Sequence, residues 1–191
     1  NVATLASLEF RYGRTERALR RLYRLVRMNP DNPQALSAYL LSLLTNKIPS
    51  LENSPTYISP GCNCVFEEAD GRRDSFVIDP MDCDGLPDRT GFYHPASEFA
   101  QSFIGRGVGD EVEVSMMFGA AKTVRIAAIG SSYLTLLDMA QERAARLDGL
   151  PNVQSLKIGD SGDPVKDLAP LHEMLSRSSA FSQGMLDLYA Q

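Results

Sequence analysis

Cysteine and histidine side chains are the residues of this chain that most directly suggest a metal site. Cys62 and Cys64 lie two positions apart, and Cys83 and His94 follow. Thiolate and imidazole groups are the usual protein ligands of zinc. The spacing matches no recognised zinc pairing, however, and alternate positions of a strand place Cys62 and Cys64 on one face, where both can be core residues. We therefore predict no metal and no other cofactor, with zinc as the alternative.

Carboxylates form a second group of candidate ligands, in a polar loop expected over residues 79–90. The composition of this loop resembles a calcium-binding loop, but the EF-hand register places Pro80 at the first ligand position and Gly91 at the twelfth. An acidic, solvated loop is therefore the expectation. The residues concerned are Asp79, Asp82, Asp84, Gly85 and Asp88.

Residues 159–164, Gly-Asp-Ser-Gly-Asp-Pro, are similar to the segment around the nucleophile of serine proteases. In those enzymes the backbone near the serine forms an oxyanion hole, and a histidine activates the hydroxyl. Here Asp163 stands where the protease segment has glycine, and His94 is the one upstream histidine. A turn before a helix explains the same residues. We therefore predict no catalytic residues.

Arginines dominate the first fifty residues. Residues 1–50 hold eight Lys and Arg against three Asp and Glu, whereas residues 51–191 carry a net charge of −10, so that the total is −5. The arginine face can meet an acidic partner, remain solvated, or pair with the acidic remainder of the chain. No aromatic residues are interleaved for base stacking, which argues against direct nucleic-acid binding. The arginines recur every three or four residues along one broad helix face: Arg11, Arg14, Arg17, Arg20, Arg21, Arg24 and Arg27.

Residues 1–45 are predicted to be helical. The apolar spacing from Arg14 to Met28 indicates an amphipathic helix, and the segment 29–33, Asn-Pro-Asp-Asn-Pro, ends it and caps a second helix over 33–45. The segment resembles the end of a tetratricopeptide repeat (TPR) array, with a plain helical hairpin as the alternative. Because the chain starts without methionine inside this helical pattern, we expect a fragment or a processed form. The TPR-like spacing is formed by Gly13, Ala18, Leu22, Leu25 and Pro30.

The rest of the chain divides into three regions. Residues 46–60 hold three prolines and read as a linker, and residues 61–130 have strand and helix patterns in the order strand, strand, helix, strand, strand. This order predicts an α+β fold, a small antiparallel sheet packed on one helix. Residues 131–191 are predicted to be a mainly helical extension that packs on the rest. The expected elements are a hairpin over 62–79, a helix over 96–104, strands over 110–116, 123–129 and 153–158, and helices over 134–147, 165–177 and 180–189.

The segment 103–114, Phe-Ile-Gly-Arg-Gly-Val-Gly-Asp-Glu-Val-Glu-Val, combines the end of an apolar helix with the start of a strand. We expect Gly105 to end the helix in the left-handed conformation, Gly109 to make the turn, Val108 to fill the core and Asp110 to open the strand. The segment resembles the carboxy-terminal domain of the bacterial GreA/GreB transcription elongation factors, and the resemblance covers about residues 58–130. It implies an FKBP-like fold that docks on RNA polymerase near its secondary channel.

This chain departs from the Gre pattern in two places. Gre factors carry an amino-terminal coiled coil with an acidic tip that helps to hold a catalytic metal, and the arginine-rich segment here has no such tip, so transcript cleavage is not expected. The family usually has Ser-Pro at the start of the helix, where this sequence has Ser97-Glu98. The resemblance places partner-binding residues on this loop and helix, with ordinary cap and surface roles as the alternative: His94, Ser97, Glu98 and Gln101.

The sequence thus predicts a non-catalytic, transcription-related regulator or adaptor in the cytoplasm. Its Gre-like region would bind RNA polymerase and its TPR-like helices another protein. No apolar run approaches the ~20 residues that cross a bilayer, and three cysteines are a poor basis for an oxidised secreted scaffold. One alternative is an interaction scaffold without polymerase contact. Another is an FKBP-like prolyl isomerase, whose aromatic pocket would be drawn from Phe66, Phe76, Phe92, Tyr93, Phe99 and Phe103.

Overall fold

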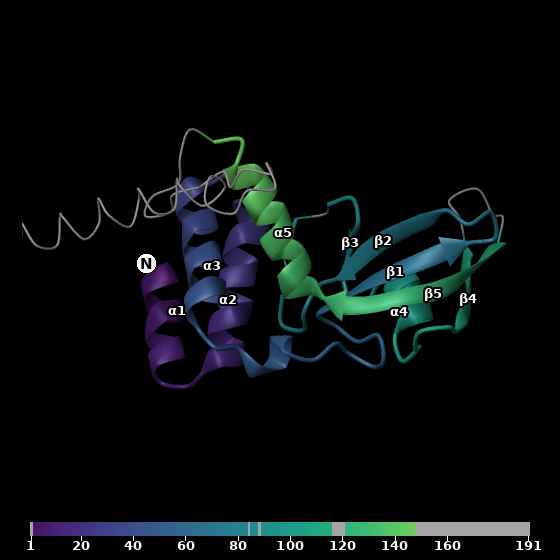
Figure 1. Ribbon diagram of the computed structural model, residues 1–191, viewed down its shortest axis with the longest axis horizontal. Coiled ribbons are helices and arrows are strands. Elements are labelled where there is room, and N and C mark those ends of the chain that lie inside the picture. Colours follow the sequence, from purple (N-terminus) through teal and green to yellow (C-terminus); the bar gives the residue numbers. More distant parts are fainter. Residues whose placement is uncertain (1, 84, 88, 116–120, 148–191) are drawn as a thin grey trace, which may run out of the picture. The chain divides into compact units, whose positions relative to one another are not determined.

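The computed structural model describes residues 2–83, 85–87, 89–115 and 121–147, which lie within one compact unit spanning Asn1–Val153. Helices and one sheet share this unit, which confirms the predicted α+β fold (Figure 1). The predicted strand-strand-helix-strand-strand order is present, with one additional strand, β3. The elements are α1 (Val2–Arg11), α2 (Thr15–Met28), α3 (Pro33–Thr45), the 3₁₀ turn η1 (Pro49–Leu51), β1 (Cys62–Glu68), β2 (Arg73–Ile78), β3 (Phe92–Tyr93), α4 (Glu98–Phe103), β4 (Glu111–Ser115), β5 (Ala121–Ser131) and α5 (Ser132–Ala144).

Four helices, α1, α2, α3 and α5, share one apolar cluster. Asn32 caps α3, because its side chain accepts hydrogen bonds from the backbone N–H groups of Gln34 and Ala35 at 2.9 and 3.1 Å. Helix α5 leaves β5 without a break and packs on α3 (Figure 1), where the Tyr39 hydroxyl donates to the Tyr133 carbonyl at 2.8 Å. The first helix of the predicted carboxy-terminal extension therefore belongs with the amino-terminal helices.

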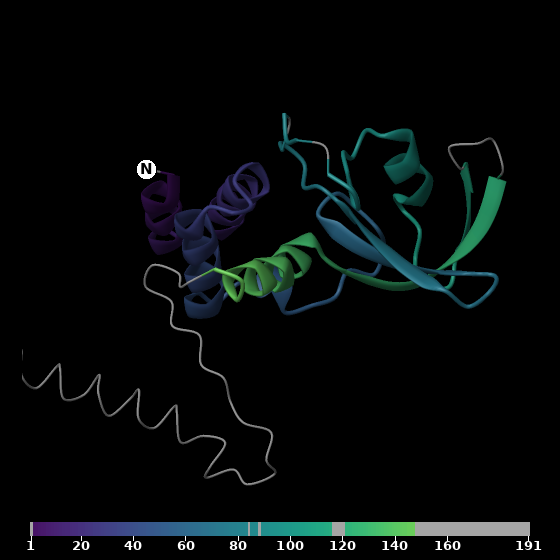
Figure 2. The same cartoon turned by 90° about the horizontal axis from the view of Figure 1, so that it is seen from above.

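The sheet has the strand order β3-β2-β1-β5-β4, and α4 lies against one of its faces (Figure 2). Strand β1 is antiparallel to β2 and β5, and β4 is antiparallel to β5. Strand β3 is instead parallel to β2, with Val77 opposite Phe92 and Ile78 opposite Tyr93. The prediction of a purely antiparallel sheet is wrong at this edge, because a long loop over 79–91, rather than a tight hairpin, connects β2 to β3.

The turn between α4 and β4 follows the predicted backbone at both glycines. Gly105 and Gly109 have φ values of +85° and +94°, a region that favours glycine. The Asp110 carboxylate accepts a hydrogen bond from the Gly107 N–H at 2.8 Å and closes the turn before β4 begins. Val108 is 61% exposed, so its predicted core role is wrong: it projects from the turn, and the buried side chains begin at Val112.

Two isoleucines of the predicted linker are buried, one in each apolar cluster. Ile48 joins the helical cluster, and Ile58 joins the cluster between the sheet and α4. The domain boundaries themselves stay a prediction. The elements expected beyond residue 147, and the protease-like segment 159–164, lie outside the described residues. No helix in the described ranges is long and apolar enough to cross a bilayer.

A buried ion pair connects α2 to the end of β2. The Arg27 Nε and Nη2 atoms donate to the Asp79 carboxylate at 3.1 and 2.9 Å, and the Tyr23 hydroxyl donates to it at 2.6 Å. Arg27 and Asp79 are 2% and 4% exposed, and the guanidinium lies 4.1 Å from the centre of the Phe92 ring. Arg27 therefore pairs with the acidic remainder of the chain, and Asp79 is not the solvated loop residue or calcium ligand that its sequence context suggests.

Replacing Asp79 with asparagine tests this pair. The change keeps the shape of the side chain but leaves the buried Arg27 charge without its partner, so we expect the free energy of unfolding to fall by about 3–5 kcal/mol. The double variant Arg27→Met/Asp79→Leu should lose less, because it removes both charges. Urea unfolding followed by circular dichroism measures both effects. Arg73→Ala, which breaks an exposed pair with Glu67, is the control and should cost at most about 1 kcal/mol. An equal loss for Asp79→Asn and Arg73→Ala would contradict the account.

Candidate functional site

The four predicted partner-binding residues lie together at the start of α4. The Ser97 hydroxyl caps the helix by accepting a hydrogen bond from the Ala100 N–H at 3.3 Å, and His94 Nδ1 accepts one from the Ala96 N–H at 3.1 Å. The Gln101 amide donates to the Pro95 carbonyl at 2.7 Å. Capping and turn roles therefore account for part of this group, and its role as a contact surface stays a prediction.

Helix α4 has one polar side and one apolar side. His94, in the loop before the helix, is exposed, as are Glu98 and Gln101 on the helix, whereas Ala100 and Phe103 are buried against the sheet. The bonds of Ser97 and Gln101 fix this short segment, so its outer side is a preorganised surface. Preorganisation lowers the entropic cost of binding a partner.

A cavity of about 340 Å³ opens on the inner face of the sheet, beside α4. Helix α4 has six residues and spans roughly 9 Å, whereas β5 has eleven residues and spans roughly 35 Å, so the helix covers only part of this face. The rings of Phe76 and Phe103 have centres 4.7 Å apart, and those of Tyr93 and Phe99 are 4.2 Å apart. Five of the six aromatic residues nominated for a pocket line the cavity: Phe66, Phe76, Tyr93, Phe99 and Phe103.

Phe92 is the exception. It lies in the helical cluster under the Arg27 guanidinium, so its assignment to the pocket is wrong. Neighbouring residues of a strand point to opposite faces, which sends Tyr93 into the cavity and Phe92 away from it.

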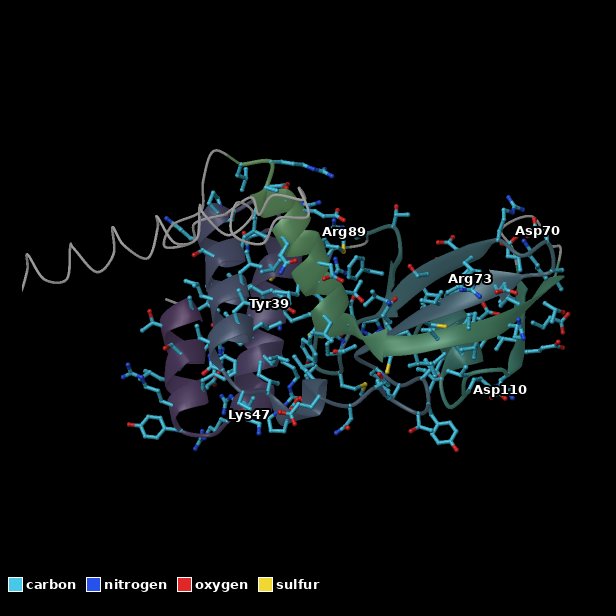
Figure 3. The ribbon with its side chains drawn as sticks, in the orientation of Figure 1. Tyr39, Lys47, Asp70, Arg73, Arg89 and Asp110 are labelled. Carbon is cyan, nitrogen blue, oxygen red and sulfur yellow. The ribbon has the colours of Figure 1, made fainter. Side chains whose placement is uncertain are left out.

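Charged side chains form the rim of the cavity at the end that lies next to the β1–β2 turn. Glu68 makes an ion pair with Lys122 and a second, at 3.4 Å, with Arg72. Asp74 also lines the cavity and is exposed. This end of the sheet, next to the β1–β2 turn, carries Asp70 and Arg73 in Figure 3. The cavity thus combines an apolar aromatic floor with a charged rim.

A second hollow, of about 600 Å³, lies along the arginine face of α2. Arg21 makes two hydrogen bonds of 2.9 Å to the nearly buried Glu9 carboxylate, and Arg17 pairs with the same group at 2.9 Å. The Arg21 hydrogen bond lowers the pKa of Glu9. Arg20 pairs with Asp82 at 3.4 Å. Arg24 and apolar side chains, among them Leu25 and Met28, complete this lining, which we call the arginine groove.

The structure separates the residues of the zinc alternative. Cys62 and Cys64 are buried between the sheet and α4, Cys83 is buried in the helical cluster, and His94 lies on the exposed loop. In the described part of the chain no group of three or more His, Cys, Asp or Glu side chains is arranged to hold a metal. Burial raises the pKa of the Cys64 thiol to about 12. These cysteines therefore act as core residues.

Comparisons with known proteins give structural neighbours but no sequence match. Neither the protein-family models nor the curated proteins match the chain. GreA/GreB from Nitrosomonas europaea is similar with a TM-score of 0.36 and 15% identity, over 49% of this chain and 77% of that chain. Thermus aquaticus Gfh1 has a TM-score of 0.34 and 20% identity, over 49% and 60%, and Thermus thermophilus Gfh1 has 0.33 and 16%, over 68% and 94%. At these scores the likenesses establish neither a family nor an activity for this chain.

Thiol reactivity tests the assignment of the cysteines to the core. In a Cys62→Ala/Cys83→Ala chain, Cys64 should react with iodoacetamide at pH 8 at least about 100-fold more slowly in the native state than in urea, because burial, the larger cause of its raised pKa, removes most of the thiolate. Mass spectrometry of the alkylated peptide gives both rates. Equal rates in the native and unfolded chain would contradict a buried, protonated thiol.

Proposed function

We propose that this chain is a non-catalytic, transcription-related regulator that binds RNA polymerase through the outer side of α4 and a second protein through its helices. The observation that carries the proposal is the segment 103–114, which resembles the Gre carboxy-terminal domain. Its two glycines, Gly105 and Gly109, have the positive φ values that suit a helix end and a turn, and β4 begins at Glu111. The element order around the segment supports the same interpretation.

The outer side of α4 has the composition of a protein interface. His94, Glu98 and Gln101 supply polar groups. Two exposed apolar side chains, Tyr57 and Val108, lie just past the end of the helix, where Tyr57 forms a bridge with Gly107. Protein–protein contacts usually combine apolar and polar side chains in this way. In this proposal, polymerase contacts the polar side of α4 and the apolar pair together.

The arginine groove supplies the second surface of the proposed adaptor. Its arginines and apolar side chains suit an acidic segment of a partner protein, because opposite charge steers association and apolar contact retains the partner. The TPR-like spacing of α2 agrees with such a use. Glu9 already neutralises part of the charge of Arg17 and Arg21, and no aromatic side chain among the described residues lines the groove, so nucleic acid is the poorer occupant.

The proposal of a non-catalytic role rests on the charge of the amino-terminal helices. Helices α1 and α2 are rich in arginine, and the α1 carboxylate of Glu9 is already paired with Arg17 and Arg21, so this segment differs from the acidic tip of a Gre factor. The proposed role places the chain in the cytoplasm with polymerase. A scaffold without polymerase contact remains the competing proposal, and it differs in one outcome, the absence of polymerase binding.

A pull-down with purified bacterial RNA polymerase core tests the proposal. We expect the parent chain to retain the enzyme and Glu98→Lys to retain at least about tenfold less, because the change reverses the charge on the polar side of α4 without touching a hydrogen bond of the helix start. Glu113→Lys is the matched control, since Glu113 is exposed on β4, and it should behave as the parent does.

The Ser97 cap needs its own comparison. Ser97→Asp keeps a cap and should retain polymerase, whereas Ser97→Ala should weaken binding together with the stability of the helix start, by about 1 kcal/mol. Absence of binding by the parent chain would contradict the proposal and favour the scaffold.

A further inference from the structure

We propose that the aromatic cavity and the adjoining edge of β2 form a binding site for an extended peptide segment of a partner protein. The segment would place one bulky apolar side chain in the cavity and a lysine or arginine, two positions away, beside Asp74. This site goes beyond the proposed function, which uses the opposite side of α4 and the arginine groove. Three features support this site: the apolar floor of the cavity, the open edge of β2 and the negative charge of Asp74 at the rim.

The floor of the cavity is rigid and apolar. Phe76 and Phe103 are buried, whereas Phe66, Tyr93 and Phe99 are half-buried and border the opening. Ring contacts at 4.9 Å between Phe76 and Phe99 and 5.7 Å between Phe76 and Tyr93 are edge to face, a favourable geometry that resists collapse of the cavity. A volume of about 340 Å³ is enough for one large side chain. The floor therefore selects size and apolar character.

The edge of β2 beside the cavity has no neighbouring strand in the described ranges. Strand β3 pairs with β2 only at Val77 and Ile78. The Val77 N–H donates to the Gly91 carbonyl at 2.7 Å and the Asp79 N–H to the Tyr93 carbonyl at 3.0 Å, so odd-numbered residues point their N–H groups away from β1. Ser75 has the same orientation, and its N–H is held by the Asp74 carboxylate at 2.7 Å.

Residues 73–75 of β2 are exposed, and Asp74 and Ser75 line the cavity. An unpaired strand edge recognises an extended peptide by adding it as a further strand, with alternate side chains entering pockets. Because edge and cavity are continuous, one peptide can use both at once. This continuity identifies the occupant as an extended segment rather than a helix or a small molecule.

The rim adds a charge preference. Lys122 is engaged by Glu68, whereas the Asp74 carboxylate is exposed and has no Lys, Arg or His within ion-pair distance among the described residues. Asp74 and Phe76 are two positions apart on β2 and share the face of the cavity. In an added strand, a side chain two positions from the one in the cavity therefore comes next to Asp74. Lysine or arginine at that position is complementary in charge.

An array of synthetic peptides about nine residues long tests the site, with the full chain as the probe. The fifth position carries each amino acid in turn, and the third and seventh carry arginine, glutamate or alanine. We expect Leu, Ile, Met, Phe or Trp at the fifth position, combined with arginine at the third or seventh, to bind at least about tenfold more strongly than alanine peptides. Binding that ignores the fifth position would overturn the proposal.

Substitutions assign the binding to this site. Asp74→Arg should change the preference at the third and seventh positions from arginine to glutamate, whereas Glu113→Arg, on the opposite face of the sheet, should leave it unchanged. Ser75→Pro should weaken every peptide, because the proline ring takes the place of the outward N–H and obstructs an added strand at this edge. Circular dichroism checks folding, and Asp74→Arg keeps the test valid if Ser75→Pro does not fold. An unchanged preference in Asp74→Arg would overturn the proposal.

The peptide preference can be measured independently of polymerase binding. Glu98→Lys lies on the outer side of α4 and should bind the peptide array as the parent chain does. A chain that binds the array but not polymerase would contradict the proposed function alone. A chain that binds polymerase but shows no peptide preference would contradict this inference alone.

Discussion

The buried pair of Arg27 and Asp79 is the interaction on which the arrangement of helices and sheet depends. Two charges withdrawn from water are tolerated only when they meet in good geometry, so α2 must bring Arg27 to the end of β2. The same guanidinium covers Phe92 and thereby fixes β3 beside β2. Strand β3 leads directly into the loop and helix of the candidate site. A buried ion pair between α2 and the end of β2 thus helps to position residues that it does not touch.

The short helix α4 gives the sheet two different surfaces. Its outer side carries the polar residues and lies beside the exposed Tyr57 and Val108, and its inner side contributes Phe99 and Phe103 to the cavity. The cavity remains uncovered because the helix is shorter than the strands, and the Ser97 cap fixes the start of the helix that carries both surfaces. The arginine groove on α2 is a third surface. An adaptor needs separate contact surfaces of this kind, and each carries a different chemistry.

Local patterns in the sequence predicted much of this fold. The apolar spacing of α2, the β1–β2 hairpin, the left-handed Gly105 and the turn at Gly109 depend on neighbours a few residues away, and all are confirmed. Strand β3 has two residues and no periodic pattern, so it escaped prediction. Arg27 and Asp79 each have the local context of a solvated residue, and their pairing across 52 positions has no signal in the sequence.

The candidate site likewise has one part that local sequence predicts and one part that depends on contacts between distant residues. His94, Ser97, Glu98 and Gln101 were identified together because they are close in sequence, whereas the cavity needs residues from five strands and a helix. Composition alone nominated its aromatic residues, and only the position of β3 separates Tyr93 from Phe92.

Hydrogen–deuterium exchange of the full chain with and without RNA polymerase core tests most directly the central claim that the outer side of α4 binds polymerase. The account predicts slower exchange for amides 96–104 in the complex, and unchanged exchange there, with or without protection of α1 and α2, would contradict it.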